Sequence, residues 1–420
     1  MGNSLLSNFR EKTSKIKDAG INRQAEFDVQ YSTGFLALDY LNGTVVHVDT
    51  EDKSFTYNSV GLVDGSANTF IGRTNSGKST LTMQIAGNII RPFVKKKLPT
   101  ALFIDDIEGS LPFVRKAFLL GLSTEEINEY VQIRNAGINT ENVLQRIRAI
   151  RDEKTSHRKD YEYDTGLFDT DGNRIYKMIP SVYVIDSLPM LLPKDLAEEE
   201  ELGGSMSASS IAKANTMFSK QITQWCKEAN IILITINHVL DEIQMGFIPK
   251  AAQISGLKQG ERLPGGKAAM YLANNMFRTD DSTTLKDSEG FGINGSIVNV
   301  TVVKSRTNAT RRSIPLIFNK TEGRFDEVLS LFQLLKNEAR FKGAGSYQYI
   351  DGCEDHKFSQ KNFKEELEKS PELQKAFANE CFDVLKGYLS DTRSKSESLS
   401  EAYSNISSII DQLGKTEIPN

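Results

Sequence analysis

One short segment constrains this chain more than any other. Residues 70–82 read Phe-Ile-Gly-Arg-Thr-Asn-Ser-Gly-Lys-Ser-Thr-Leu-Thr and match the pattern G-x-x-x-x-G-K-[ST] at every position. In this pattern the glycines let backbone N–H groups turn inward around phosphates, the lysine reaches the β- and γ-phosphates, and the hydroxyl binds Mg²⁺. The segment therefore predicts a phosphate-binding loop for a nucleotide. Its expected ligands are Gly72, Arg73, Thr74, Asn75, Ser76, Gly77, Lys78, Ser79 and Thr80.

The residues around this loop predict the fold class. Residues 68–71 are β-prone, and residues 81–90 carry a helical pattern, so a helix N-terminus would add its dipole to the anion site. Strand and helix patterns alternate over residues 30–330, which is typical of an α/β fold with a twisted, mostly parallel sheet. Strands are expected at 101–105, 183–186, 231–237, 276–279, 297–304 and 314–319.

The chain is expected to divide into three parts. Residues 1–30 contain an amphipathic helix at 4–19, whose apolar face needs a partner. Residues 31–330 form the α/β core, with an apparent insertion at 152–180 that Asp171-Gly172 predicts to be a surface hairpin. Residues 331–420 form a helical, polar C-terminal region.

Composition limits the classes of protein that remain. The 420 residues carry a formal charge of −4, which excludes a uniformly basic coat for nucleic acid and leaves a local basic stripe as the alternative. The three cysteines form no C-x-x-C pair, which favours free thiols in a reducing compartment. No run approaches the roughly 20 apolar residues of a membrane span. We therefore expect a soluble, cytoplasmic protein with no membrane partner.

Three apolar strand patterns end in polar residues that suit nucleotide chemistry. Asp186 follows one and is expected to hold Mg²⁺. Glu108 follows another and could polarise the attacking water, although Asp105 and Asp106 compete for that role. His238 follows the third and could sense the γ-phosphate.

A further strand pattern ends in two cations, Lys304 and Arg306. Side chains at i and i+2 of a strand lie on the same side, so the pair could neutralise charge on a transferring phosphoryl group. A solvated strand end is the equally weighted alternative.

Two long polar segments, 197–210 and 240–263, are candidates for nucleic-acid contact. The first leads into a helix with Lys213 and Lys220, whose seven-residue spacing suits successive phosphates of a single strand. The second carries Arg262 and ends near Lys267. Polar loops with ordinary charges are the alternative reading.

Together these residues resemble the RecA family of recombinases, and within it the UvsX-type recombinases of tailed phages, over about residues 30–330. The quoted motifs are Ser-Thr-Gly34 with Leu38-Asp39, the phosphate-binding loop, Asp106-Ile-Glu108, Ile185-Asp186-Ser187, Asn237-His238, Pro264-Gly265-Gly266, and Lys304-Ser-Arg306. The resemblance favours Glu108 over its neighbours as the catalytic carboxylate. It also implies DNA contacts at Gly265 and Gly266. No motif identifies the aromatic residue that stacks on adenine, and Phe113 is only a guess for it. The 152–180 insertion has no counterpart in the family pattern.

The resemblance implies a RecA-type P-loop ATPase core that uses ATP and Mg²⁺. It implies a helical filament on single-stranded DNA, pairing with double-stranded DNA, ATP sites between subunits, and docking of residues 1–30 on the adjacent subunit. A single-strand-binding protein and a loading mediator are the further partners expected, and a phage-encoded protein would act in the bacterial host cytoplasm. A ring helicase with the same fold and a non-hydrolysing, nucleotide-gated DNA scaffold are the alternatives.

Overall fold

A computed structural model describes residues 28–109, 111–197, 207–241, 256–264, 268–289, 292–343 and 347–391. The expected helix at residues 4–19 lies outside the described residues, as do Gly265, Gly266 and Lys267. Among the described residues, no helix is both long enough and apolar enough to cross a bilayer.

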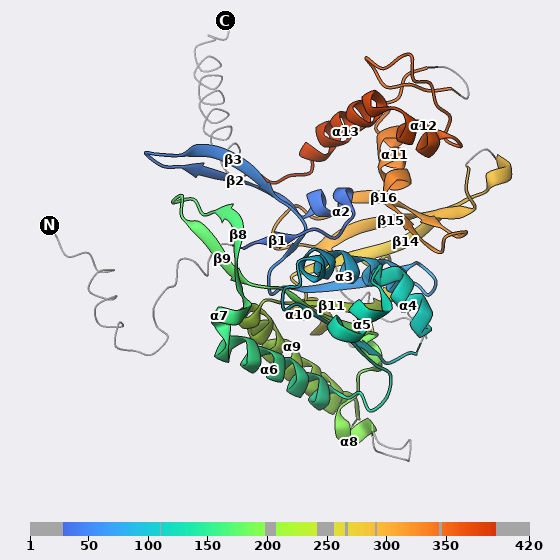
Figure 1. Cartoon of the computed structure of the whole chain (residues 1–420). Helices are drawn as coiled ribbons and strands as arrows, with labels where there is room; N and C mark the ends of the chain where they lie inside the picture. The colour runs from blue at the N-terminus through green and yellow to red at the C-terminus, as the bar shows by residue number, and fades with distance from the viewer. Residues whose placement is uncertain are drawn as a thin grey trace, which may run out of the picture.

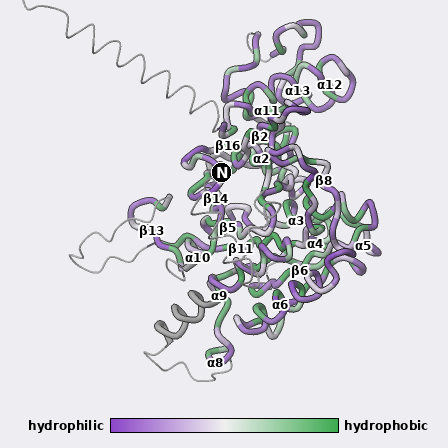
Figure 2. Tube along the Cα trace, turned by 90° about the vertical axis from the view of Figure 1, so that its left-hand side faces the viewer, coloured by the Kyte–Doolittle hydropathy of each residue, from purple (hydrophilic) through white to green (hydrophobic). Residues whose placement is uncertain are grey.

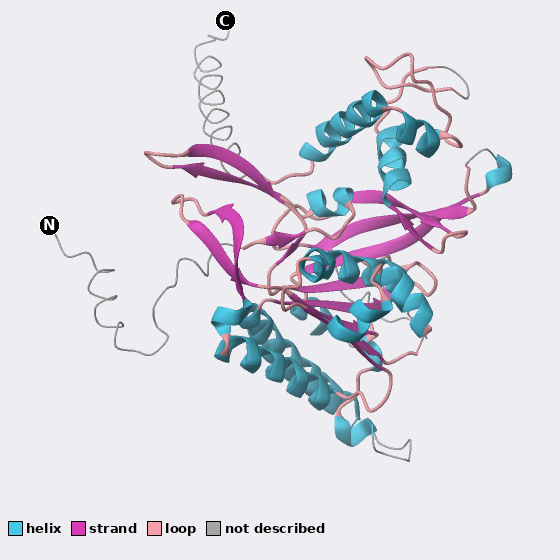
Figure 3. Ribbon diagram, viewed as in Figure 1, coloured by secondary structure: helices cyan, strands magenta, loops and turns pink. Residues whose placement is uncertain are grey.

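A large, mostly parallel central sheet organises the chain, which confirms the predicted α/β class (Figures 1 and 3). The strands from β14 to β7 pair in parallel, and β15, β16 and β17 extend the sheet with antiparallel pairs. In the described part of the chain its order is β17 (Arg324–Asp326), β16 (Ser313–Asn319), β15 (Gly295–Lys304), β14 (Asn275–Leu285), β5 (Ala67–Gly72), β11 (Ile231–His238), β10 (Ser181–Asp186), β6 (Ala101–Asp106) and β7 (Val131–Arg134).

All six predicted strands are present. Five differ from the prediction by at most two residues at either end. The exception is β14, which continues to Leu285 because it keeps pairing with β15 after its last partner on β5, Gly72.

Helices cover both faces of the sheet, so successive residues of a central strand enter different clusters. On β10, Val182 and Val184 pack into the core that includes α3 (Lys78–Lys95), while Tyr183 and Ile185 pack with α9 (Ser207–Ala229). Burial on both faces explains why the central strands are almost continuously apolar. Figure 2 shows hydrophobic segments around β5, β11 and β6 in the middle of the molecule.

The remaining elements connect or flank these layers. On the side of α9, α6 (Thr140–Ser156) packs along that helix (Figure 1). On the side of α3, α4 (Phe113–Leu120) packs against that helix. The other described elements are β1 (Gln30–Tyr31), α2 (Leu36–Leu41), β4 (Leu62–Val63), α5 (Thr124–Tyr130), α7 (Arg158–Tyr161), η2 (Leu188–Met190), α8 (Lys194–Ala197), β12 (Leu240–Asp241), β13 (Glu261–Arg262), α10 (Ala268–Leu272) and η3 (Asp287–Glu289).

The predicted inserted hairpin exists but is shorter than expected. It consists of β8 (Glu162–Phe168) and β9 (Arg174–Met178), with Gly172 in the turn at a φ of 77°. Residues 152–161 are mostly helical instead, because α6 continues to Ser156 and α7 follows. The prediction for the first ten residues of the insertion was therefore wrong.

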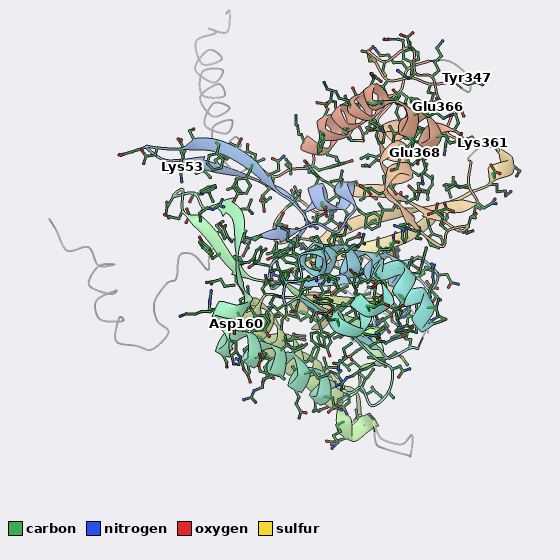
Figure 4. The ribbon with its side chains drawn as sticks, viewed as in Figure 1. Lys53, Asp160, Tyr347, Lys361, Glu366 and Glu368 are labelled. Atoms are coloured by element: carbon green, nitrogen blue, oxygen red, sulfur yellow. The ribbon has the colours of Figure 1, made fainter. Side chains whose placement is uncertain are left out.

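This hairpin packs against a second one, β2 (Thr44–Asp49) with β3 (Ser54–Ser59). The Tyr57 hydroxyl donates to the Phe168 carbonyl at 2.8 Å, and Lys53 Nζ donates to the Gly172 carbonyl at 3.0 Å. Lys53 lies between the two hairpins in Figure 4. The insertion is thus anchored to the N-terminal part of the core.

The described residues of the C-terminal region are helical only in part. The helices among them are α11 (Glu327–Asn337), α12 (Phe363–Lys369) and α13 (Pro371–Lys386), and they enclose a cluster of phenylalanines. The members of that cluster are Phe332, Phe341, Phe358, Phe363 and Phe377. Described residues between α11 and α12 are largely irregular, and residues 392–420 lie outside the described part.

Candidate nucleotide site

Parallel pairing brings the polar strand ends to one edge of the sheet. Gly72 at the end of β5 pairs with His238 at the end of β11. Asp186 at the end of β10 pairs with Asp106 at the end of β6. Ligands of α/β proteins bind at this carboxyl edge.

The glycine-containing segment forms a tight turn between a strand and a helix. It leaves β5 at Gly72, turns through residues 73–77 and enters α3 at Lys78, with Ser79 and Thr80 in the first helical turn. Gly77 has a φ of 83°, and a side chain there would meet the Phe325 ring at 2.7 Å. Only glycine fits that position without strain.

Lys78 is buried at the centre of this loop. Its side chain is withdrawn from water, the residue being only 5% exposed, and its Nζ donates to the Arg73 carbonyl at 2.7 Å. Burial lowers the pKa of Lys78 to about 8, while the carboxylates of Asp186 and Glu108 act in the opposite direction. An anion arriving beside this ammonium would compensate its desolvation.

Asp186 carries a polar atom with no partner. Its Oδ1 atom is buried and accepts no hydrogen bond among the described residues. Burial raises the pKa of Asp186 to about 6, the Ser79 hydroxyl lowers it, Glu108 and Asp106 raise it further, and Lys78 lowers it. An unpaired oxygen next to a hydroxyl fits Mg²⁺, which takes one or two protein ligands and completes its shell with phosphates and water.

The described residues contain no cluster of three or more histidine, cysteine or acidic side chains able to hold a metal. A magnesium site that shares its ion with bound phosphates does not need one. Ser79 and Asp186 therefore fit Mg²⁺ only together with a nucleotide.

Glu108 faces the same edge and is held by two neighbours. Its Oε1 accepts a hydrogen bond from the Ser187 hydroxyl and lies 2.8 Å from His238 Nε2. Partial burial would raise the pKa of Glu108, but the hydrogen bonds from Ser187 and His238 and the charge of Lys78 prevail and lower it. The carboxylate is thus ionised and oriented near neutral pH.

The two competing aspartates are engaged elsewhere. Asp105 forms an ion pair with Arg146 and accepts a hydrogen bond from the Tyr183 hydroxyl. Asp106 forms a buried ion pair with Lys116 at 2.5 Å. Glu108 is therefore the best-placed carboxylate of the three to meet Lys78, a distinction that the sequence pattern alone left open.

Lys304 and Arg306 lie at the opposite edge of the sheet. Since β15 is antiparallel to β14, Lys304 pairs with Met276, near the start of β14. The expectation that both cations project from one side of a strand is wrong, because β15 ends at Lys304.

The two cations also differ in environment. Lys304 Nζ donates to the carbonyls of Met270 and Ala273, at 2.5 Å each, at the C-terminal end of α10. Burial and the neighbouring Arg306 lower its pKa. Arg306 is exposed and forms no hydrogen bond or ion pair with another residue that the structure describes.

Few of the predicted DNA contacts can be located. Lys220 is exposed on α9, and Arg262 is exposed on β13. Position 213 lies within α9, but its side chain is not described. The spacing argument for Lys213 and Lys220 therefore stays a prediction.

A cavity of about 530 Å³ lies next to Asp106 at the carboxyl edge of the sheet. Asp106 at the end of β6 and Lys116 on α4 line it, as do Asn128 and Asn135, and the half-exposed Phe113 of α4 borders it. The cavity is large enough for a nucleobase. Phe113 borders it, and stacking of Phe113 on adenine stays a prediction.

Two features of this region were not predicted from the sequence, namely the role of Ser187 and an ion network around Arg73. Ser187 was quoted only as part of a motif, although its position directly after Asp186 could have indicated a role at the same edge. The ion network of Arg73 with Asp241 and Glu261 joins residues 168 or more positions apart, for which the sequence holds no local signal.

Comparison with known proteins gives no further guide. Neither a protein-family model nor a curated protein matches this chain.

Proposed function

We propose that this chain binds and hydrolyses ATP at the edge formed by Lys78, Asp186 and Glu108. The observation that carries the proposal is the meeting of these three side chains, from separate segments, beside a glycine loop that opens a helix. Lys78 would contact the β- and γ-phosphates, and Ser79 and Asp186 would hold Mg²⁺. When bound, Mg²⁺ supplies charge neutralisation for the phosphate oxygens.

Glu108 acts in this proposal on the attacking water. Its ionised carboxylate accepts a hydrogen bond from that water and orients it toward the γ-phosphorus. Ser187 and His238 fix the carboxylate, and His238 also lies beside Gly72 at the start of the loop. In this proposal His238 would respond to an occupied γ-phosphate position.

The proposal extends to a RecA-type recombinase that forms filaments on single-stranded DNA and catalyses homologous pairing and strand exchange. Support comes from β11, which ends at His238 and leads within two residues into β12. The segment that follows β12 is one of the two expected to contact DNA. Nucleotide state and DNA binding would thus be linked through a few residues.

The opposite edge supports a filament rather than an isolated chain. Arg306 lies across the sheet from the P-loop of its own chain, so the phosphate that it would serve must belong to another copy. Contact between opposite edges of successive copies is a head-to-tail interface, which generates a ring or a helical filament.

Swapping one duplex for an equivalent one is nearly balanced in energy. ATP would therefore serve assembly and release of the filament more than the exchange itself.

The test is Glu108→Gln with Asp105→Asn as a matched control, assayed with and without single-stranded DNA. Glu108→Gln should bind ATP and DNA but lose turnover by about a hundredfold or more, the range typical of lost transition-state stabilisation. Asp105→Asn should keep turnover, since Asp105 pairs with Arg146. Near-native hydrolysis by Glu108→Gln would reject the mechanism. Electron microscopy with a slowly hydrolysed ATP analogue should show helical filaments on DNA, whereas closed rings would favour a ring helicase.

A further inference from the structure

Arg73, inside the phosphate-binding loop, forms ion pairs that none of the steps above uses. Its Nη2 lies 2.5 Å from Asp241 Oδ1, and its Nη1 donates to Asp241 Oδ2 at 3.3 Å. The same Nη2 lies 3.6 Å from Glu261 Oε1. Asp241 ends β12 and Glu261 begins β13, and these two residues pair with each other. One side chain of the loop thus contacts both strands of a small β-stem.

The β13 side of this stem is firmly anchored. Arg278, on β14, donates to both carboxylate oxygens of Glu261 at 2.6 and 3.0 Å and is itself buried. The Lys258 backbone N–H adds a third hydrogen bond to Glu261 at 2.8 Å. Arg278 above all lowers the pKa of Glu261 to about 2. Glu261 therefore stays charged and fixed to the central sheet.

The β12 side is held weakly. The side chains of Arg73 and Asp241 are 56% and 70% exposed, so water and salt compete with their ion pair. Apart from the β-pairs with β13, the contact between Arg73 and Asp241 is the described ion pair that ties β12 to the loop. The start of β12 is held separately, since Val239 is buried and its N–H donates to the Gly72 carbonyl at 3.0 Å. The stem thus has one fixed strand and one strand whose Asp241 end is held by Arg73.

Phosphate would compete for Arg73 by two routes. The guanidinium is next to a site for several negative charges, and a polyphosphate is a stronger partner than one exposed carboxylate. In addition, Lys78 Nζ is bonded to the carbonyl of Arg73 itself. Recruitment of Lys78 to phosphate would weaken that bond and leave the Arg73 carbonyl with the Ser76 N–H, at 3.2 Å, as its remaining donor.

We propose that Arg73 is a positioning residue that couples the nucleotide site to the β12–β13 stem: bound phosphate draws Arg73 away from Asp241 and releases β12, while Glu261 keeps β13 on Arg278. This inference rests on the proposed nucleotide site and adds the route by which its occupancy reaches the segment between β12 and β13. The proposal predicts the direction of the change: bound nucleotide loosens the β12–β13 stem.

Hydrogen exchange of the full chain, followed on peptides covering 238–241 and 261–264, tests this. The probe is adenosine 5′-(γ-thio)triphosphate with Mg²⁺, without DNA. In the unmodified chain the nucleotide should speed exchange of the stem amides about two- to fivefold, the size expected when a largely exposed ion pair is lost. In Arg73→Gln and in Asp241→Asn the stem should exchange at the faster rate already, with no further response to nucleotide.

Two controls separate the possible failures. Arg174→Gln breaks another partly exposed ion pair, between Arg174 on β9 and Asp164 on β8 at 2.9 Å, and should leave the stem response unchanged. The double variant Arg73→Gln/Asp241→Asn should exchange no faster than either single variant if both act through one contact. Absence of nucleotide binding in the unmodified chain would overturn the proposed function and this inference together. Nucleotide binding with slower stem exchange, or an unaltered response in Arg73→Gln, would overturn the inference alone.

Discussion

Two buried lysines at opposite edges of the central sheet show how similar burial serves different ends. Lys78, at the carboxyl edge, is 5% exposed, donates to one carbonyl and lies near two carboxylates. Lys154, at the amino edge, is 2% exposed and donates to the Ile179 carbonyl at 2.7 Å, with the Ser181 hydroxyl and the Asn230 carbonyl at 3.3 and 3.4 Å.

Their surroundings differ in a way that supports the role proposed for Lys78. Three neutral oxygens surround Lys154, so its hydrogen-bonding capacity is filled by the fold. Lys78 has one such acceptor and is surrounded instead by the charged groups of a site. Burial lowers the pKa of both, to about 8 for Lys78 and about 7 for Lys154. A low lysine pKa alone therefore does not mark a functional site; the partners decide.

The largest expected effect compares the two lysines directly. Lys78→Ala should abolish ATP binding and, with it, hydrolysis, because the phosphate clamp is removed. Lys154→Met should retain hydrolysis within a factor of about two, since its partners belong to the fold. Equilibrium titration with ATP and a turnover assay measure both. Comparable loss of turnover in the two folded variants would remove the distinction.

The next largest effect concerns Arg306, at the amino edge of the sheet, whose charge is proposed to act on a nucleotide bound by another copy of the chain. Arg306→Ala should lower DNA-stimulated hydrolysis by about a thousandfold, as expected for a charge supplied across an interface to a transferring phosphoryl group. Arg311→Ala, at another exposed arginine of the same loop, is the control and should keep the rate.

Mixing tests whether Arg306 acts between chains. Arg306→Ala and Glu108→Gln chains should each be inactive. Assembled together on DNA, some interfaces pair an intact Glu108 with an intact Arg306, so part of the activity should return. Co-assembly without any recovery would mean that Arg306 acts within its own chain or only structurally.

A third prediction uses the pKa of Lys154. Its folded pKa of about 7 lies below the unfolded value near 10.5, so the unfolded chain binds the extra proton between these pH values. Stability contributed through this group therefore rises as pH rises from about 7 toward 10. Relative to Lys154→Met, the free energy of unfolding of the unmodified chain should increase by up to about 1.4 kcal/mol per pH unit. Urea unfolding of both proteins at pH 7, 8 and 9 measures this, and parallel curves would show that Lys154 is not desolvated.

The sequence predicted the strand ends well because an apolar run stops where a strand leaves the core. Asp186, Glu108 and His238 were located on that basis. Strand alternation also separates Asp105 from Asp106, since successive residues lie on opposite faces, and the structure has them paired with Arg146 and Lys116 respectively. The motif was needed to choose Glu108, which lies beyond the strand and has no periodicity to place it.

Contacts between distant segments could not be predicted in the same way. Nothing near Arg73 in the sequence indicates Asp241, because their meeting depends on β11 lying beside β5. Arg306 was expected to lie on a strand, but β15 ends two residues earlier, at Lys304. The residue pattern of a strand does not indicate where its hydrogen-bonded pairing ends. The prediction for the insertion was wrong at residues 152–156, where α6 continues to Ser156. The polar sequence of this stretch does not distinguish a helix from a loop.

The smallest expected effect concerns binding of DNA, and it compares exposed cations on α9 and β13 with one in the C-terminal region. Lys220→Ala and Arg262→Ala should each weaken binding of single-stranded DNA, and each should reduce the slope of log affinity against log salt by about 0.7, the value for one phosphate contact. Lys375→Ala, at an exposed lysine of α13 in the C-terminal region, should leave the slope unchanged. Fluorescence anisotropy with a labelled oligonucleotide at several salt concentrations measures all three.

Base composition of the oligonucleotide should matter little, because contacts to phosphates carry no sequence information. Equal slope changes in all three variants would indicate diffuse attraction by the whole surface rather than contacts at α9 and the stem.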